Sequence, residues 1–218
     1  SNQTLSIFSQ YIHSLGDLDL WAGIRLEDYK ESDRNVSYNC GASWAVSEDW
    51  KIKAVYGNAF RTPFARQLQE NKTDMEHIET VSLQAAWRPF DGTKFHITGF
   101  RSILEDYFAE DPALGLSEPG NQDIYGIEVK AEVTPFQTLK LNSSLSWIHT
   151  AGDATHFRFP EYYLPVNGEL VPRYTHYFEP YDAGADILFN ADVYYRINRN
   201  AVLRAGCSYT GERTGRYL

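Results

Sequence analysis

The stretch Tyr56-Gly57-Asn58-Ala59-Phe60-Arg61-Thr62-Pro63 marks the point where a long strand ends and a polar loop begins. Before it, apolar side chains recur at alternate positions from residue 50 onward, which indicates a strand with one apolar face. Pro63 has no amide hydrogen to donate and favours extended geometry at Thr62, so the strand leaves its sheet here. Residues 64–74 are polar and have no period of two. A long strand with aromatic residues near its end, followed by a polar loop, is typical of the rim of a membrane barrel.

Composition favours strands over helices and argues against some partners. Of the 218 residues, 15% are aromatic and fifteen are tyrosine. The net charge of -9, without a basic stripe, argues against a nucleic-acid partner. There is no run of eighteen apolar residues and no segment resembling a signal peptide, so we expect a mature or excised piece. Ser1 and Asn2 are interpreted as a cloning remnant.

The same alternation recurs along the chain and predicts ten strands. Their expected ranges are residues 4–15, 18–29, 36–47, 50–60, 79–90, 94–108, 123–134, 139–150, 185–197 and 201–209. In the sixth, the parity is lost around Gly99 and Phe100, which predicts a bulge. Cys40 and Cys207 share a parity with small and apolar neighbours, so we interpret both as small apolar strand residues.

The connections between these strands sort into two kinds. Those after residues 15, 47, 90, 134 and 197 are short, and those after residues 29, 63, 108 and 150 are longer. Outer-membrane barrels have this asymmetry, and a tilted strand needs about 9 to 11 residues to span a bilayer. We therefore predict an all-β fold, an antiparallel up-and-down meander of about ten long strands that forms part of a transmembrane β-barrel. A soluble β-sandwich or meander is the alternative.

Five motifs resemble the TonB-dependent outer-membrane receptors. Tyr56, Gly57, Phe60, Arg61 and Pro63 match the family's Tyr-Gly-x-Ala-Phe-Arg-x-Pro strand end at its fixed positions. The other matches, in the family's order, are Leu-Trp-Ala-Gly-Ile-Arg at 20–25, Glu76 with Glu79, the segment 99–107, and Asn121 with Tyr125-Gly126-Ile127-Glu128. Together they are more specific than any one motif.

The resemblance implies energised import, in which TonB pulls on an N-terminal plug inside a barrel of about 22 strands. This chain has no recognisable plug or TonB box, so residues 1–218 are expected to be a single partial β-barrel domain of a larger receptor in the bacterial outer membrane, unable to transport alone. The implied partners are outer-membrane lipid, the missing plug and remaining barrel strands, and TonB through that plug. The implied ligand is a small molecule such as a siderophore, cobalamin or a glycan. No cofactor is expected.

An aromatic-rich segment, residues 155–182, is the candidate site of ligand contact. The candidate residues are His156, Arg158, Tyr162, Tyr163, Arg173, Tyr174, His176 and Tyr177. We expect a long irregular loop, which is commonly functional or disordered. Aromatic faces and arginine head groups suit an anionic catecholate-type chelate or a sugar. A loop packed on itself, or an extended aromatic belt, is the alternative.

Other interpretations of these residues stay open. His156 and His176 invite a haem or metal interpretation, but residues 70–79 lack the Asn-Pro-x-Leu motif of haem receptors, and no metal site is predicted. His176 with Asp153 or Asp182 could serve a complete ten-stranded outer-membrane protease, and the aromatic segment could serve a soluble glycan-binding module. No residue spacing compels either function.

Four charged residues near the opening stretch are assigned structural roles. Arg61 and Glu79 are interpreted as rim and strand-stabilising residues, and Lys51 and Lys53 as lumen charges that face water or a plug.

Overall fold

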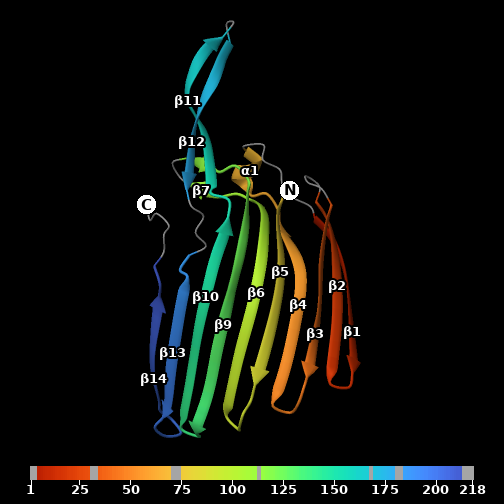
Figure 1. The fold of residues 1–218 in the computed structure, drawn as a ribbon, viewed down its shortest axis with the longest axis vertical. Coiled ribbons are helices and arrows are strands. Elements are labelled where there is room, and N and C mark those ends of the chain that lie inside the picture. Colours follow the sequence, from red (N-terminus) through yellow and green to blue (C-terminus); the bar gives the residue numbers. More distant parts are fainter. Residues whose placement is uncertain are drawn as a thin grey trace.

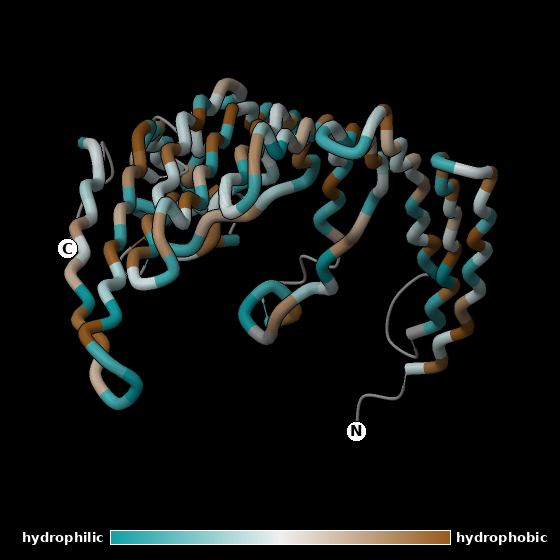
Figure 2. The backbone as a smooth tube through the Cα atoms, turned by 90° about the horizontal axis from the view of Figure 1, so that it is seen from below, coloured by the Kyte–Doolittle hydropathy of each residue, from teal (hydrophilic) through white to brown (hydrophobic). Residues whose placement is uncertain are grey.

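Ten strands form one antiparallel sheet, in the order β1-β2-β3-β4-β5-β6-β9-β10-β13-β14. The structure is a computed structural model that describes residues 4–29, 34–69, 75–111, 114–166, 169–179 and 184–212. Viewed along its strands, the sheet curves as an open arc with β1 and β14 at its edges (Figure 2). The predicted meander and partial barrel are thereby confirmed.

The strands of the sheet are nine to seventeen residues long. They are β1 (Thr4–Leu15), β2 (Leu18–Tyr29), β3 (Asn35–Ala45), β4 (Trp50–Arg61), β5 (Glu76–Trp87), β6 (Thr93–Tyr107), β9 (Gly120–Phe136), β10 (Leu139–Gly152), β13 (Ile187–Arg196) and β14 (Val202–Thr210) (Figure 1). The remaining elements are α1 (Ala65–Gln69), β7 (Glu110–Asp111), β8 (Gly115–Leu116), β11 (Thr155–Val166) and β12 (Glu169–Glu179). No helix within the described ranges is long and apolar enough to cross a membrane.

The two ends of the sheet differ as the connections predict. At one end the chain reverses in tight turns, where Gly16 and Gly92 have φ of 61° and 77°, a backbone conformation that glycine adopts without strain. At the other end lie α1, the small β7-β8 sheet and a hairpin of β11 and β12 that projects beyond the barrel wall (Figure 1). We call these the turn edge and the loop edge.

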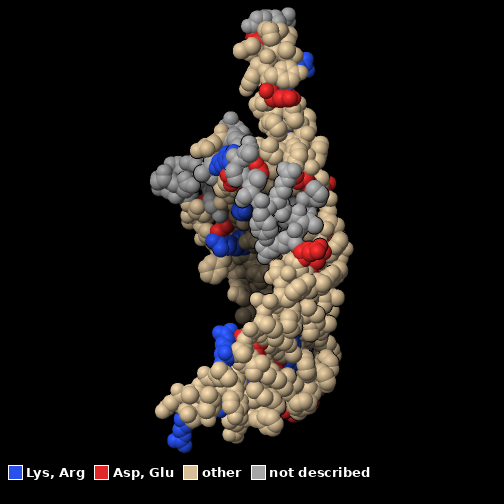
Figure 3. All heavy atoms as spheres, turned by 90° about the vertical axis from the view of Figure 1, so that its left-hand side faces the viewer, with Lys and Arg blue, Asp and Glu red and all other residues tan. Residues whose placement is uncertain are grey.

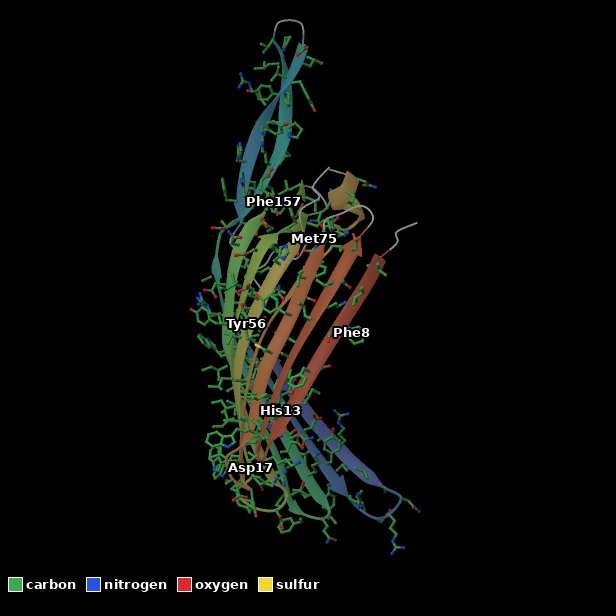
Figure 4. All side chains as sticks on the ribbon, turned by 90° about the vertical axis from the view of Figure 1, so that its right-hand side faces the viewer. Phe8, His13, Asp17, Tyr56, Met75 and Phe157 are labelled. Carbon is green, nitrogen blue, oxygen red and sulfur yellow. The ribbon has the colours of Figure 1, made fainter. Side chains whose placement is uncertain are left out.

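Apolar side chains on the outer face remain exposed. Cross-strand pairing places Ile52, Ala85, Ile97 and Val129 in one row, and Leu83 in the next row is 58% exposed. The buried apolar residues of the described chain are Met75, Phe108, Leu116, Phe157 and Ala185. Figure 4 places Met75 and Phe157 at the loop edge, away from the middle of the wall. The outer rows therefore do not pack against a second layer, which excludes the sandwich and fits a face turned to lipid.

The inner face is mostly polar and lines a hollow. Lys51, Lys53, Gln84 and His96 border a groove of about 630 Å³ on this side. Seen from the β14 edge, lysine and arginine side chains border the hollowed side of a largely uncharged wall (Figure 3). Apolar exceptions occur near the β1 edge, where Phe8 is 77% exposed and pairs with inward Arg25. The polar side chains that make up most of this face fit a water-filled barrel interior.

The predicted bulge at Gly99 and Phe100 is wrong. Register with β5 and β9 is continuous through both residues, and the irregularity lies between Leu104 and Tyr107, where Asp106 has φ of 54°. The alternation of apolar and polar residues is interrupted because Phe100 is an apolar residue on the inner face, where its ring packs over Gly126. A Cβ at Gly126 would lie 2.9 Å from Phe100 Cζ, so the missing side chain makes room for the ring.

The expectation of an irregular loop over residues 155–182 is also wrong for most of that segment. Residues 155–166 and 169–179 pair as an antiparallel hairpin, with one register shift between Pro160 and Tyr162. Pro160, Pro165 and Pro172 lie in these strands. Each strand of an isolated hairpin has a free edge, which tolerates the missing amide hydrogen.

A change to arginine should affect stability very differently on the two faces of the wall. Leu83→Arg should lower the free energy of unfolding from a bilayer by about 2 to 4 kcal/mol, because it places a cation in hydrocarbon. Gln84→Arg, on the inner face, should change it by less than about 0.5 kcal/mol. Denaturant titration of the receptor folded into phospholipid vesicles measures both, and equal losses in the two variants would contradict the assignment of faces.

Candidate functional site

At the end of β4, the side chain of Asn58 continues the hydrogen bonding between β3 and β4 after their backbone pairing stops. Pairing of β3 with β4 stops at Asn39 and Gly57. Beyond it, Asn58 Oδ1 accepts a hydrogen bond of 2.7 Å from the Tyr38 backbone N-H, and Asn58 Nδ2 donates one of 3.3 Å to the Val36 carbonyl. A Cβ at Gly57 would lie 3.0 Å from the Tyr38 carbonyl oxygen, so glycine permits the close approach. The strands can therefore separate at the loop edge without leaving these groups unpaired.

A buried carboxylate joins the end of β4 to the loop after β6. Arg61 lies opposite Glu76 in the β4-β5 ladder and donates to Glu76 Oε1. The same oxygen accepts a hydrogen bond of 3.2 Å from the Phe108 backbone N-H. Glu76 is only 5% exposed, whereas the Arg61 side chain is 54% exposed. A charge this buried is tolerated because it is both paired and hydrogen-bonded.

The loop after β6 in turn holds the base of the hairpin. Ser117 Oγ accepts a hydrogen bond of 2.9 Å from the Ala109 N-H, and Ser117 forms an isolated β-bridge with Phe157. The Glu118 N-H donates to the His156 carbonyl at 2.6 Å. These contacts surround a small core, which we call the rim cluster. Its members are Met75, Glu76, Phe108, Leu116, Ser117 and Phe157.

Helix α1 is tied to the same region. Arg66 Nη1 lies 2.8 Å from Glu110 Oε1 of β7, and Gln67 Oε1 accepts a hydrogen bond of 3.0 Å from the Phe64 N-H. Pro63, Phe64 and Arg61 border a hollow of about 480 Å³ next to these contacts. Three connections of the loop edge are thus joined to one another.

The hairpin brings half of the predicted ligand residues together on one face. Register places His156 opposite Phe178 and His176 opposite Arg158. The Arg158 guanidinium carbon lies 3.9 Å from the centre of the Tyr174 ring. The His156 and Phe178 rings stack with centroids 4.4 Å apart and planes 7° apart. His156, Arg158, Tyr174 and His176 therefore form one patch of aromatic and basic groups, which we call the hairpin face.

The other four candidates lie elsewhere on the hairpin. Tyr162 lies opposite Arg173, and Tyr163 opposite Pro172, beyond the register shift. Both tyrosines are more than half exposed. Tyr177 pairs with the buried Phe157 and is half-buried. The eight predicted residues therefore do not converge on a single pocket.

The alternative protease triad is not assembled by the contacts observed. His176 Nδ1 lies 2.8 Å from His156 Nε2, and Asp153 Oδ2 accepts from the Asn121 N-H at 3.0 Å. Asp182 lies outside the described residues.

Sequence reasoning missed the roles of Phe157 and Ser117. Phe157 is 2% exposed and Ser117 1% exposed. The only signal was the alternation of His156, Phe157 and Arg158, which places Phe157 on the opposite side of the hairpin. Ser117 carried none, because it contacts backbone groups at Ala109, eight residues earlier, and at Phe157 in the hairpin.

Paired polar groups limit the apolar band near the loop edge. Arg101 Nη2 lies 2.7 Å from Asp123 Oδ2, and Tyr56 donates to Glu79 at 3.1 Å. All four side chains belong to outward-facing positions, because Tyr56 pairs with Val81 and Val81 with Arg101. Charges at this level need an interfacial rather than a hydrocarbon environment.

Removing the buried carboxylate should loosen the loop edge. Glu76→Ala removes the hydrogen bond from the Phe108 N-H and the carboxylate paired with Arg61, and should cost about 1 to 3 kcal/mol. Limited proteolysis should then cut between residues 62 and 119 faster than in the wild type. The matched control is Glu79→Ala, which removes an exposed carboxylate from the same strand. Equal protection of both variants would contradict a structural role for Glu76.

Comparison with known proteins agrees with this architecture. The family described as TonB dependent receptor-like, beta-barrel matches residues 1–213. Among solved structures, the FrpB iron transporter from Neisseria meningitidis (F3-3 variant) is similar, with 17% identity, a TM-score of 0.66, and 94% of this chain and 31% of that chain covered.

Two further structures give the same result. The ferric-catecholate import receptor Fiu from K12 E. coli has 12% identity, a TM-score of 0.69, and coverage of 96% and 34%. The siderophore receptor PirA from Pseudomonas aeruginosa has 18% identity, a TM-score of 0.64, and coverage of 95% and 42%. At these identities the likeness shows the fold, and the chain spans between about a third and two fifths of the length of each structure. By its match over residues 1–213, the chain belongs to the TonB-dependent receptor β-barrel family, a family of receptors and not of enzymes.

Proposed function

We propose that this chain is barrel wall from an outer-membrane receptor that imports a scarce ligand, such as an iron-siderophore complex, with energy supplied through TonB. Residues 1–218 would form one partial β-barrel domain. The plug, the remaining strands and the contact with TonB would come from other parts of the receptor. The loop edge would face the cell exterior, because barrels of this kind carry their longer loops there.

The observation that carries the proposal is the exposed basic and aromatic surface of the hairpin. Arg158 and Arg173 are exposed, as are Tyr162, Tyr163 and Tyr174. Arginine head groups bind anionic oxygen atoms by charge-assisted hydrogen bonds, and tyrosine rings stack on flat aromatic groups. An anionic chelate built from aromatic rings offers both kinds of contact.

The anchoring of the hairpin supports the same function. The Ser117-Phe157 bridge and the Glu118-His156 hydrogen bond attach the hairpin base to the loop that receives the Glu76 contact. A ligand bound on the hairpin face would therefore be held by a segment connected to the barrel rim. Rigid support of a binding surface lowers the entropy lost when the ligand binds.

Arg158→Ala should weaken the binding of an anionic ligand. Hydrogen bonds to charged groups contribute about 1.5 to 3 kcal/mol, so we expect at least about a tenfold loss of affinity. The test uses cells expressing the full-length receptor, a strain lacking TonB, and a radiolabelled panel of iron-siderophore complexes, cobalamin and glycans. Tyr209→Ala, on the outer face of β14, is the control and should bind normally.

The panel also separates the alternatives. Uptake of a catecholate complex that requires TonB and is weakened by Arg158→Ala agrees with the proposal. Uptake of cobalamin or of a glycan instead would agree with the assignment as a receptor but identify a different ligand. The absence of TonB-dependent uptake of any compound in the panel would contradict energised import.

A further inference from the structure

Two histidines of the hairpin form a contact that the proposed import function does not require. His156 on β11 and His176 on β12 are diagonal neighbours on the hairpin face, since each lies opposite the residue two positions from the other. His156 Nε2 and His176 Nδ1 are 2.8 Å apart, and the ring centroids are 5.0 Å apart with planes at 21°. His176 is exposed and His156 half-buried, so solutes can reach the pair.

The separation of these two nitrogens lies close to that of two imidazole ligands on one metal ion. Zinc-nitrogen bonds are about 2.0 to 2.1 Å long and tetrahedral, so two ligating nitrogens are roughly 3.3 Å apart. An opening of about half an ångström, together with a turn of the exposed His176 ring that points its lone pair at the ion, would therefore make room for the metal. The ring that donates the present hydrogen bond would carry its proton on the other ring nitrogen, leaving a lone pair on each facing nitrogen.

The residues around the two histidines restrict the rotation of one ring and place little positive charge where it would repel a bound cation. Phe178 stacks on the His156 ring and restricts its rotation. Arg158, the nearest cation in the ladder, has its guanidinium over Tyr174 at 3.9 Å. Acidic residues also lie near the pair. Glu179 is three residues from His176 on β12, Thr175 beside His176 bonds to Glu161, and the Glu118 backbone N-H bonds to the His156 carbonyl.

We propose that His156 and His176 form a two-imidazole site for a borderline divalent transition-metal ion such as Zn²⁺. Imidazole nitrogen favours zinc, copper and nickel over calcium and magnesium, which prefer oxygen ligands. The described residues contain no group of three or more histidine, cysteine, aspartate or glutamate side chains arranged to hold a metal. Water or an external ligand therefore completes the coordination, so the site is open and exchangeable.

Zinc titration of the full-length receptor in detergent tests the site. At pH 7.5, His156→Ala and His176→Gln should each weaken binding at least tenfold, and the double variant should be little worse than either, because chelation needs both rings. Magnesium should not compete.

His13→Ala is the matched control, because His13 is an exposed histidine on the outer face of β1, stacked on Tyr11. It should leave zinc affinity unchanged. X-ray absorption of the zinc complex provides a second readout that does not depend on folding of the variants, and should show two imidazole nitrogens at about 2.0 to 2.1 Å. Unchanged affinity in both hairpin variants, an equal loss in His13→Ala, or fewer than two imidazole ligands would overturn the proposal. These outcomes do not depend on whether the receptor imports siderophores.

Discussion

The wall is held together by backbone hydrogen bonds between neighbouring strands, while its apolar side chains remain unpacked. In hydrocarbon no water can satisfy an amide or carbonyl group, so the ladder must pair every strand. Every neighbouring pair of strands from β1 to β14 is hydrogen-bonded, with register shifts between Leu104 and Tyr107 and between Leu139 and Leu141. Among the described residues, β1 and β14 each pair on one side only, and in a bilayer their outer backbone groups would also need partners. The outer side chains need only match the lipid, which explains why the wall has no core.

Conventional packing is confined to the loop edge. There the chain must leave the ladder, and its backbone groups need other partners. Asn58 supplies one, Glu76 accepts from the Phe108 N-H, and Ser117 bonds to Ala109. Asn58, Glu76 and Ser117 thus satisfy backbone groups that have left the ladder. Glu76 also places a buried charge beneath the loops, where it joins the barrel wall to the loop that holds the base of the hairpin.

The sequence was most informative where side chains alternate between lipid and water. The ten strands, the two kinds of connection and the absence of a second layer could be predicted because each depends on a period of two. Phe100 misled that analysis because a large inward side chain needs only a glycine opposite it, at Gly126. Prolines concealed the hairpin, since the sequence does not say that its strands have free edges. The pairing of His156 with His176 depends on register, which residue types alone do not specify.

In this barrel wall, odd-numbered residues of β5 should face lipid and even-numbered ones should face water. This orientation can be tested with single cysteines at positions 80 to 87, in a full-length receptor whose Cys40 and Cys207 are replaced by alanine, each carrying a spin label in a bilayer. We expect exposure to membrane-dissolved oxygen to peak at 81, 83 and 85, and exposure to a water-soluble nickel reagent to peak at 82 and 84. Two profiles without alternation, or with the opposite phase, would contradict this orientation.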